Sequence, residues 1–136
     1  IVWGPLSQGR LSGKFRREQP MPAGSRVAQG AGEGPEMPEE WFYSVVDVLD
    51  AISAETGKTV AQVSLNWLLQ RPTVASVIIG ARDEAQLRDN LGAVGWNLTA
   101  EQVKRLDGVS ELDTIYPYWH QRGFANRNPT ATAVYK

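Results

Sequence analysis

The sequence has 136 residues, of which 42% are apolar and 21% are charged, and its formal net charge is −1. The apolar fraction suffices for a buried core, while the near-neutral charge argues against nucleic acid or an anionic membrane as a partner. No apolar run approaches the ~18 residues of a membrane span. The absence of cysteine excludes disulfides and thiolate metal sites. We expect a cytoplasmic protein.

The chain opens in an apolar, strand-like run, residues 1–3, that ends at a Gly-Pro break. There is no initiating Met, so we expect this strand to continue from something upstream. Residues 14–38 follow as a stretch rich in Gly and Pro. A loop of this length in a compact domain is typical of a lid or a binding loop.

Two helices are predicted next. Over residues 38–55, apolar side chains recur at intervals of three and four, which is the spacing of one helical face. A second helix is predicted over residues 59–70, because Thr at its first position is a good N-cap. Its polar face is expected to consist of Gln62, Asn66 and Gln70, which are four residues apart.

A buried parallel strand is predicted over residues 74–79, because this short β-branched run lies between a proline and a glycine. Asp83 then caps a third helix, on which Leu87, Leu91 and Val94 are expected to share one face.

A fourth helix is predicted behind Thr99 and Gln102, which have the spacing of a capping box. Residues 112–136 form an irregular, aromatic tail that includes the aromatic cluster 116–120. Strands that alternate with helices predict an α/β fold with a parallel sheet and right-handed crossovers.

Two segments stand where parallel strands leave the sheet, residues 3–14 and residues 76–90. In a TIM barrel that face holds the active site, and the loops after the last two strands commonly bind phosphate. Backbone N–H groups at a helix start suit an anion. Arg82 adds a guanidinium that can grip a phosphate with two hydrogen bonds.

Together these segments resemble the aldo-keto reductase family. The run Trp-Gly-Pro-Leu-Ser-Gln-Gly-Arg-Leu-Ser-Gly-Lys at residues 3–14 is similar to the family's aromatic-Ser-Pro-Leu segment and the Gly-Leu-Leu-Thr-Gly-Lys that follows strand seven. Ile-Ile-Gly-Ala-Arg at residues 78–82 is similar to the end of strand eight. The resemblance implies that residues 1–136 are the C-terminal portion of a (β/α)8 TIM barrel: its last two strands, their helices, an extra helix and a C-terminal tail.

The resemblance also implies roles for the first segment, within a cofactor loop or lid at residues 14–38. Trp3 would stack on the nicotinamide ring of NADP(H); the alternative is an ordinary buried tryptophan. Lys14 and Arg26 would reach phosphates, the alternative being solvated surface charges. Gly4 stands where the family commonly has Ser, so a hydroxyl contact is lost. The turn that would wrap the pyrophosphate with backbone N–H groups consists of Gly4, Pro5, Leu6, Ser7 and Gln8.

In the second segment Gly80 would permit close approach of the cofactor. Arg82 would grip the adenosine 2′-phosphate, which favours NADP(H) over NAD(H). Gln86, Asp89 and Asn90 would face the adenine. Gln86 has a competing structural role, since it also lies at capping-box spacing from the expected N-cap.

The family reduces aldehydes and ketones by hydride transfer, with catalytic Asp, Tyr, Lys and His residues that come from earlier strands. The resemblance therefore implies no catalytic residue in this chain, and we expect no metal site. We expect the chain alone to be inactive, because these catalytic residues are missing from it. Two strands cannot close a barrel, so we expect the native state to need the upstream part. Its implied partners are a small carbonyl substrate and the N-terminal part of the same barrel. The tail at residues 116–120 would border the substrate or simply pack over the barrel.

Two alternatives remain for the function. One is a non-catalytic NADP(H)-binding regulatory subunit of the potassium-channel β-like type. The other is a truncated, inactive fragment of a reductase.

Overall fold

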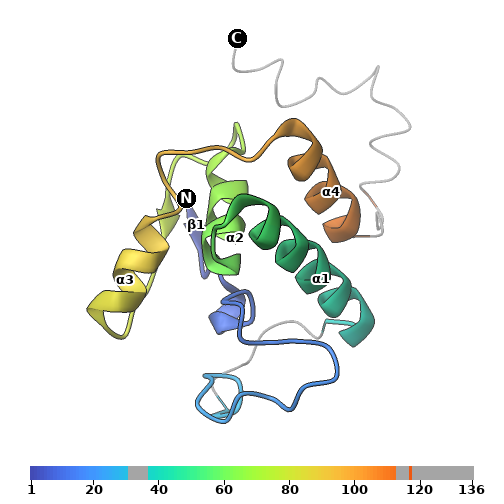
Figure 1. Ribbon diagram of the computed structural model, residues 1–136, viewed down its shortest axis with the longest axis vertical. Coiled ribbons are helices and arrows are strands. Elements are labelled where there is room, and N and C mark those ends of the chain that lie inside the picture. Colours follow the sequence, from blue (N-terminus) through green and yellow to red (C-terminus); the bar gives the residue numbers. More distant parts are fainter. Residues whose placement is uncertain (31–36, 113–116, 118–136) are drawn as a thin grey trace.

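The computed structural model describes residues 1–30, 37–112 and 117 (Figure 1). The elements that the chain forms, in order, are β1 (Val2–Trp3), the 3-10 helix η1 (Ser7–Gly9), α1 (Glu39–Thr56), α2 (Val60–Leu69), β2 (Val77–Ile78), α3 (Glu84–Leu91) and α4 (Ala100–Ser110). None of the helices in these ranges is long and apolar enough to cross a membrane. The aromatic cluster expected at residues 116–120 lies outside the described residues except for Pro117.

The two strands pair in parallel, with Val2 opposite Val77 and Trp3 opposite Ile78. This confirms the parallel sheet predicted from the alternation of strands and helices. The second strand covers Val77–Ile78 and lies within the predicted range 74–79. Val74 instead closes a turn, its N–H donating to the Arg71 carbonyl at 3.0 Å.

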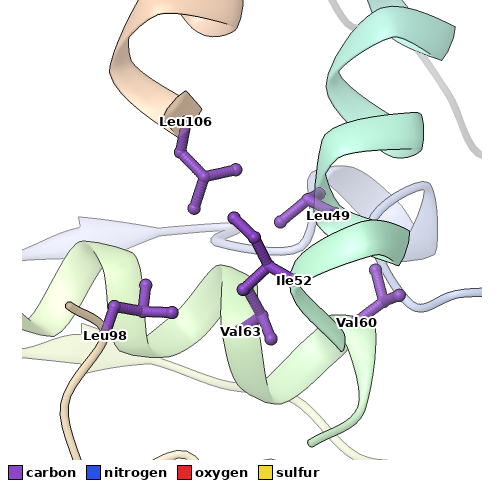
Figure 2. Close-up of a cluster of buried hydrophobic side chains, with 6 residues drawn as sticks. All are labelled: Leu49, Ile52, Val60, Val63, Leu98 and Leu106. Atoms are coloured by element: carbon purple, nitrogen blue, oxygen red, sulfur yellow. The ribbon is translucent and has the colours of Figure 1, made fainter. Parts of the chain in front are cut away.

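The core lies where α1, α2 and α4 meet, and Ile52 of α1 is at its centre with no exposed surface. Figure 2 shows this cluster, with side chains from all three helices and from the segment before α4 pointing toward Ile52. Burial of this apolar surface stabilises the helical layer that backs the two strands. The residues around Ile52 are Leu49, Val60, Val63, Leu98 and Leu106.

Local rules set the helix ends. Gly57 ends α1 in the left-handed region at φ 65°, where a glycine has no Cβ penalty. Thr59 and Gln62 form a complete capping box at the start of α2, and Thr99 and Gln102 form a second one at the start of α4. The predicted box before α4 is therefore confirmed.

The predicted polar face of α2 is wrong at its central residue. Asn66 is 2% exposed, and its side chain joins α2 to the segment between α3 and α4. Nδ2 donates to the carbonyls of Ala93 (2.9 Å) and Trp96 (2.8 Å). Oδ1 accepts from the Leu98 N–H at 3.1 Å and from Gln70 Nε2 at 2.6 Å. Each hydrogen-bonding position of the amide is used, so its burial is compensated.

The side chains predicted to form one apolar face of the third helix are exposed among the described residues: Leu87 41%, Leu91 53% and Val94 63%. Val94 lies beyond the end of α3 at Leu91. The principal neighbour of α3 is α2, which separates it from α1 and α4 in Figure 1. The attachment of α3 within this part of the chain therefore depends on polar contacts with α2.

A charged clamp ties α2 to α4. Both carboxylate oxygens of Asp107 accept from the Arg71 guanidinium, at 2.5 and 3.2 Å, and Oδ1 also accepts from Trp67 Nε1 at 2.8 Å. The guanidinium in turn lies 4.0 Å from the centre of the Trp67 ring. Hydrogen bonds from Arg71 and then from Trp67 hold the pKa of Asp107 below its ordinary value, against burial, which raises it.

This clamp predicts an acid-sensitive contribution to stability. The pKa of Asp107 is depressed in the folded state, so its contribution is complete above the ordinary aspartate value of 3.8 and is lost as the pH falls through the lower folded value. Asp107→Asn in the intact protein should flatten the acid side of a plot of Tm against pH. Glu84→Gln, which removes an exposed carboxylate that pairs with Arg88, is the control. If the Tm of Asp107→Asn falls with decreasing pH as steeply as the Tm of the wild type, the proposed contribution of Asp107 is wrong.

The buried amide gives a second prediction. Asn66→Leu should lower the free energy of unfolding by about 3 kcal/mol, because it leaves buried backbone groups without partners. Asn97→Leu, at an exposed position, should change it by less than about 0.5 kcal/mol. Urea denaturation of the intact protein measures both, and similar losses in the two variants would refute the role of Asn66.

Candidate functional site

A cleft of about 510 Å³ opens where the two parallel strands end. Because parallel strands present their carboxyl ends at the same edge of a sheet, the loops that follow β1 and β2 line this cleft from two sides. The loop at 24–26 and Met37 complete the lining. The two segments singled out in the sequence, about seventy residues apart, thus share one site.

Most of the sequence-predicted site residues line this cleft. They are Trp3, Gly4, Pro5, Leu6, Ser7, Gln8, Lys14, Arg26, Gly80, Arg82 and Gln86. Asp89 and Asn90 do not line it.

The turn after β1 has an unusual backbone. Ser7 and Gln8 both have positive φ, 48° and 58°, between Gly4 at 66° and Gly9 at 92°. Such conformations cost non-glycine residues of order 1 kcal/mol and concentrate at functional sites. The Ser7 N–H donates to the Gly4 carbonyl at 3.0 Å, and the Gly9 N–H to that of Leu6 at 2.9 Å.

These turn hydrogen bonds limit which backbone N–H groups could wrap a pyrophosphate, and the wrapping itself stays a prediction. In this conformation the Ser7 N–H is already used, and Pro5 has none to offer. The Ser7 hydroxyl and the Gln8 side chain line the cleft as polar groups instead.

Trp3 is 83% exposed at the end of β1. It is therefore not the ordinary buried tryptophan that was the alternative from the sequence. Its indole lines the cleft together with Ile78, the residue paired with it in β2. The site thus has one broad aromatic surface at the strand ends.

The segment that carries Lys14 is anchored on α1. Phe15 is 7% exposed and stacks edge-on against Phe42, with ring centroids 6.2 Å apart. Arg16 pairs with Asp50 at 2.8 Å. Lys14 lies next to these anchors, so an ordered backbone presents its exposed ammonium group to the cleft.

The charges of the cleft are of one sign. Among the described residues, no aspartate or glutamate lines it, while four cationic side chains do: Arg10, Lys14, Arg26 and Arg82. Every described arginine outside the cleft makes a salt bridge; these are Arg16, Arg17, Arg71, Arg88 and Arg105. Within the described ranges, no arginine of the cleft pairs with a carboxylate. The arrangement suits a ligand that carries several negative charges.

Arg10 is a cleft residue that the sequence analysis did not propose. Its Nη1 donates to Gln8 Oε1 at 3.1 Å, so a neutral neighbour orients the guanidinium without cancelling its charge. The position of Arg10 in the same segment, two residues beyond Gln8, is the signal by which it could have been found.

The wall after β2 is organised by the start of α3. The Asp83 carboxylate accepts from the Gln86 N–H at 2.8 Å, and Gln86 Oε1 accepts from the Arg82 N–H at 2.8 Å. The predicted N-cap is confirmed. Gln86 Oε1 accepts from the Arg82 N–H and not from that of Asp83, so its side chain orders the turn without completing a capping box, and its contact with adenine stays a prediction.

Asp89 and Asn90 point elsewhere. The Asp89 carboxylate accepts from Gln62 Nε2 and from the Thr59 hydroxyl, each at 3.2 Å. Asn90 is 3% exposed, and its Nδ2 donates to the Gly80 carbonyl at 3.4 Å. In the structure these two residues lie behind the surface of the cleft wall, and their expected contact with adenine stays a prediction.

Comparisons with known proteins agree with this geometry. The model of the Aldo/keto reductase family matches residues 1–111. An L-glyceraldehyde 3-phosphate reductase from Escherichia coli O157:H7 is 33% identical over 113 residues, which are 79% of this chain and 32% of that protein. A candidate voltage-gated potassium channel subunit beta from Schizosaccharomyces pombe is 32% identical over 114 residues, 79% of this chain and 33% of that protein.

Among solved structures, a glycerol dehydrogenase from Gluconobacter oxydans has a TM-score of 0.62 with this chain at 24% identity. The match covers 85% of this chain and 37% of that one. It confirms the predicted fold class, a part of a (β/α)8 barrel. The chain spans about a third of the length of the curated relatives it matches.

The packing of the first segment onto α2 can be tested at Gly13. This residue has φ 81°, and a Cβ there would lie 3.3 Å from Val60 Cβ. Gly13→Ala should therefore lower the free energy of unfolding by about 1–2 kcal/mol. Gly24→Ala is the control, because Gly24 has no positive φ and open space around it. Equal effects of the two variants in urea denaturation of the intact protein would contradict the geometry.

Proposed function

Since this chain belongs to the aldo/keto reductase family, we propose that its cleft binds NADP(H) in an oxidoreductase that interconverts carbonyls and alcohols. The observation that carries the proposal is the charge of the cleft, which holds four cationic side chains and no carboxylate. A phosphorylated dinucleotide has both a pyrophosphate and a 2′-phosphate, and it needs several cations at separate places along one groove.

The residues of the cleft fit such a cofactor. Arg82 follows β2 and has a free side chain beside the start of α3, where the helix dipole also favours an anion. Lys14 and Arg26 approach from the opposite segment and loop. In the proposed mode Arg82 binds the 2′-phosphate, and Lys14 and Arg26 bind the pyrophosphate or the neighbouring phosphate oxygens.

Trp3 fits the other end of the ligand. Its exposed indole offers a flat apolar face against which a nicotinamide ring can stack while the opposite face of the ring meets the substrate. When bound, the nicotinamide supplies or accepts the hydride. The role of this chain is to bind and orient. Among the described residues that line the cleft there is no tyrosine, histidine or carboxylate, so the proton donor would come from the rest of the enzyme.

A second candidate is a non-catalytic NADP(H)-binding regulatory subunit. The similarity to the candidate potassium channel subunit beta, at 32% identity, favours it. The same cleft would then report cofactor occupancy or redox state to a partner. Turnover of a small aldehyde with NADPH by the intact protein separates the two, since only an oxidoreductase consumes the cofactor at a steady rate.

The cofactor assignment is tested by reversing one charge. Arg82→Glu in the intact protein should weaken the binding of NADPH by about tenfold or more and the binding of NADH much less, because only NADPH carries the 2′-phosphate. Quenching of tryptophan fluorescence by each dinucleotide gives the two dissociation constants. Arg88→Glu makes the same change on α3 outside the cleft and is the matched control. Equal weakening of both dinucleotides by Arg82→Glu would refute the assignment.

A further inference from the structure

We propose that Gln62 and Asp89 are positioning residues that set the place of Arg82, and thereby the preference of the cleft for the phosphorylated dinucleotide. The inference rests on the proposed function, because it concerns the same cleft. It adds a task for Asp89 beside the adenine contact that the family resemblance implies.

The first step concerns how α3 is held. This helix follows the cleft wall directly, and α2 is its principal neighbour (Figure 1). The apolar side chains of Leu87 and Leu91 are exposed within the described part of the chain and contribute little burial there. Directional hydrogen bonds hold α3 against α2 in this part of the chain.

Those hydrogen bonds converge on Asp89. Gln62 Nε2 donates to the Asp89 carbonyl at 2.9 Å and to its carboxylate at 3.2 Å, and the Thr59 hydroxyl donates to the other carboxylate oxygen at 3.2 Å. Gly92 makes room for this approach, because a Cβ at that position would collide with Gln62 Nε2. We call these groups the α2–α3 contact.

The contact is linked to the cleft through the next residue. Asn90 is buried, and its Nδ2 donates to the carbonyl of Gly80, which follows β2 and lines the cleft. The other end of the wall is held by Gln86, whose Oε1 accepts from the Arg82 N–H. Hydrogen bonds thus run from α2 to Asp89 and from the neighbouring Asn90 to Gly80, while Gln86 on the same helix holds the N–H of Arg82 itself.

The chain provides a matched control for this contact. Gln62 and Gln102 each complete a capping box by accepting from the threonine N–H with Oε1, and each donates with Nε2 to a neighbouring helix. Gln102 donates to Glu55 Oε2 at 3.0 Å, on α1, and lines no part of the cleft. A Gln→Glu change at either site keeps the side-chain oxygen that caps the helix. It replaces Nε2 by a carboxylate oxygen, which repels the acceptor to which Nε2 donated.

The experiment measures the dissociation constants of NADPH and NADH for the intact wild-type protein and for each variant. Gln62→Glu should lower the preference for NADPH over NADH by about fivefold or more, because a misplaced Arg82 loses only the contact with the 2′-phosphate. Gln102→Glu should leave the preference unchanged even though it loses a comparable contact. In an Arg82→Ala background, Gln62→Glu should have no further effect on the preference.

Asp89→Ala separates positioning from contact with adenine, and it keeps the carbonyl to which Gln62 donates. Loss of an adenine contact weakens the binding of both dinucleotides by the same factor. Loss of the positioning of Arg82 weakens the binding of NADPH more than that of NADH. Equal weakening in Asp89→Ala, or an unchanged preference in Gln62→Glu, would overturn the inference. A wild-type protein that binds neither dinucleotide would instead overturn the proposed function, so the two failures are distinguishable.

Discussion

The site depends on one short parallel pairing. The Val2 N–H donates to the Ser76 carbonyl at 2.9 Å, and two residue pairs place β1 beside β2 in the same direction. Parallel strands need a long crossover between them, and here α1 and α2 provide it over the core around Ile52. The pairing brings two loops about seventy residues apart to one edge of the sheet, and no local interaction could do so.

The second determinant is the distribution of charge. Salt bridges near the surface contribute little to stability individually, yet six of them within the described ranges neutralise the five arginines outside the cleft. The arginines of the cleft have no carboxylate partner within the described ranges. A chain with a net charge of −1 can therefore present a locally positive cleft, which total composition does not reveal.

Polar side chains inside the fold are the third determinant of the site. Asn66 and Gln62 lie one turn apart on α2 and bind the segments after and within α3. Apolar contacts would tolerate small rotations of one helix on another, whereas hydrogen bonds with fixed donors and acceptors do not. Because α3 begins at the wall of the cleft, such directional contacts help to fix the orientation of that wall.

The sequence by itself determined the features that depend on near neighbours. The N-caps at Thr59 and Asp83 and the capping box at Thr99 follow from rules that act over a few residues, and for this reason they could be predicted. Spacing alone misplaced Asn66, because its backbone partners Ala93 and Leu98 lie 27 and 32 residues away. Only the packing of the segment after α3 on α2 decided that this side chain turns inward. Likewise, only the pairing of β1 with β2 decided the register of the two strands, because it joins residues that are far apart in the sequence.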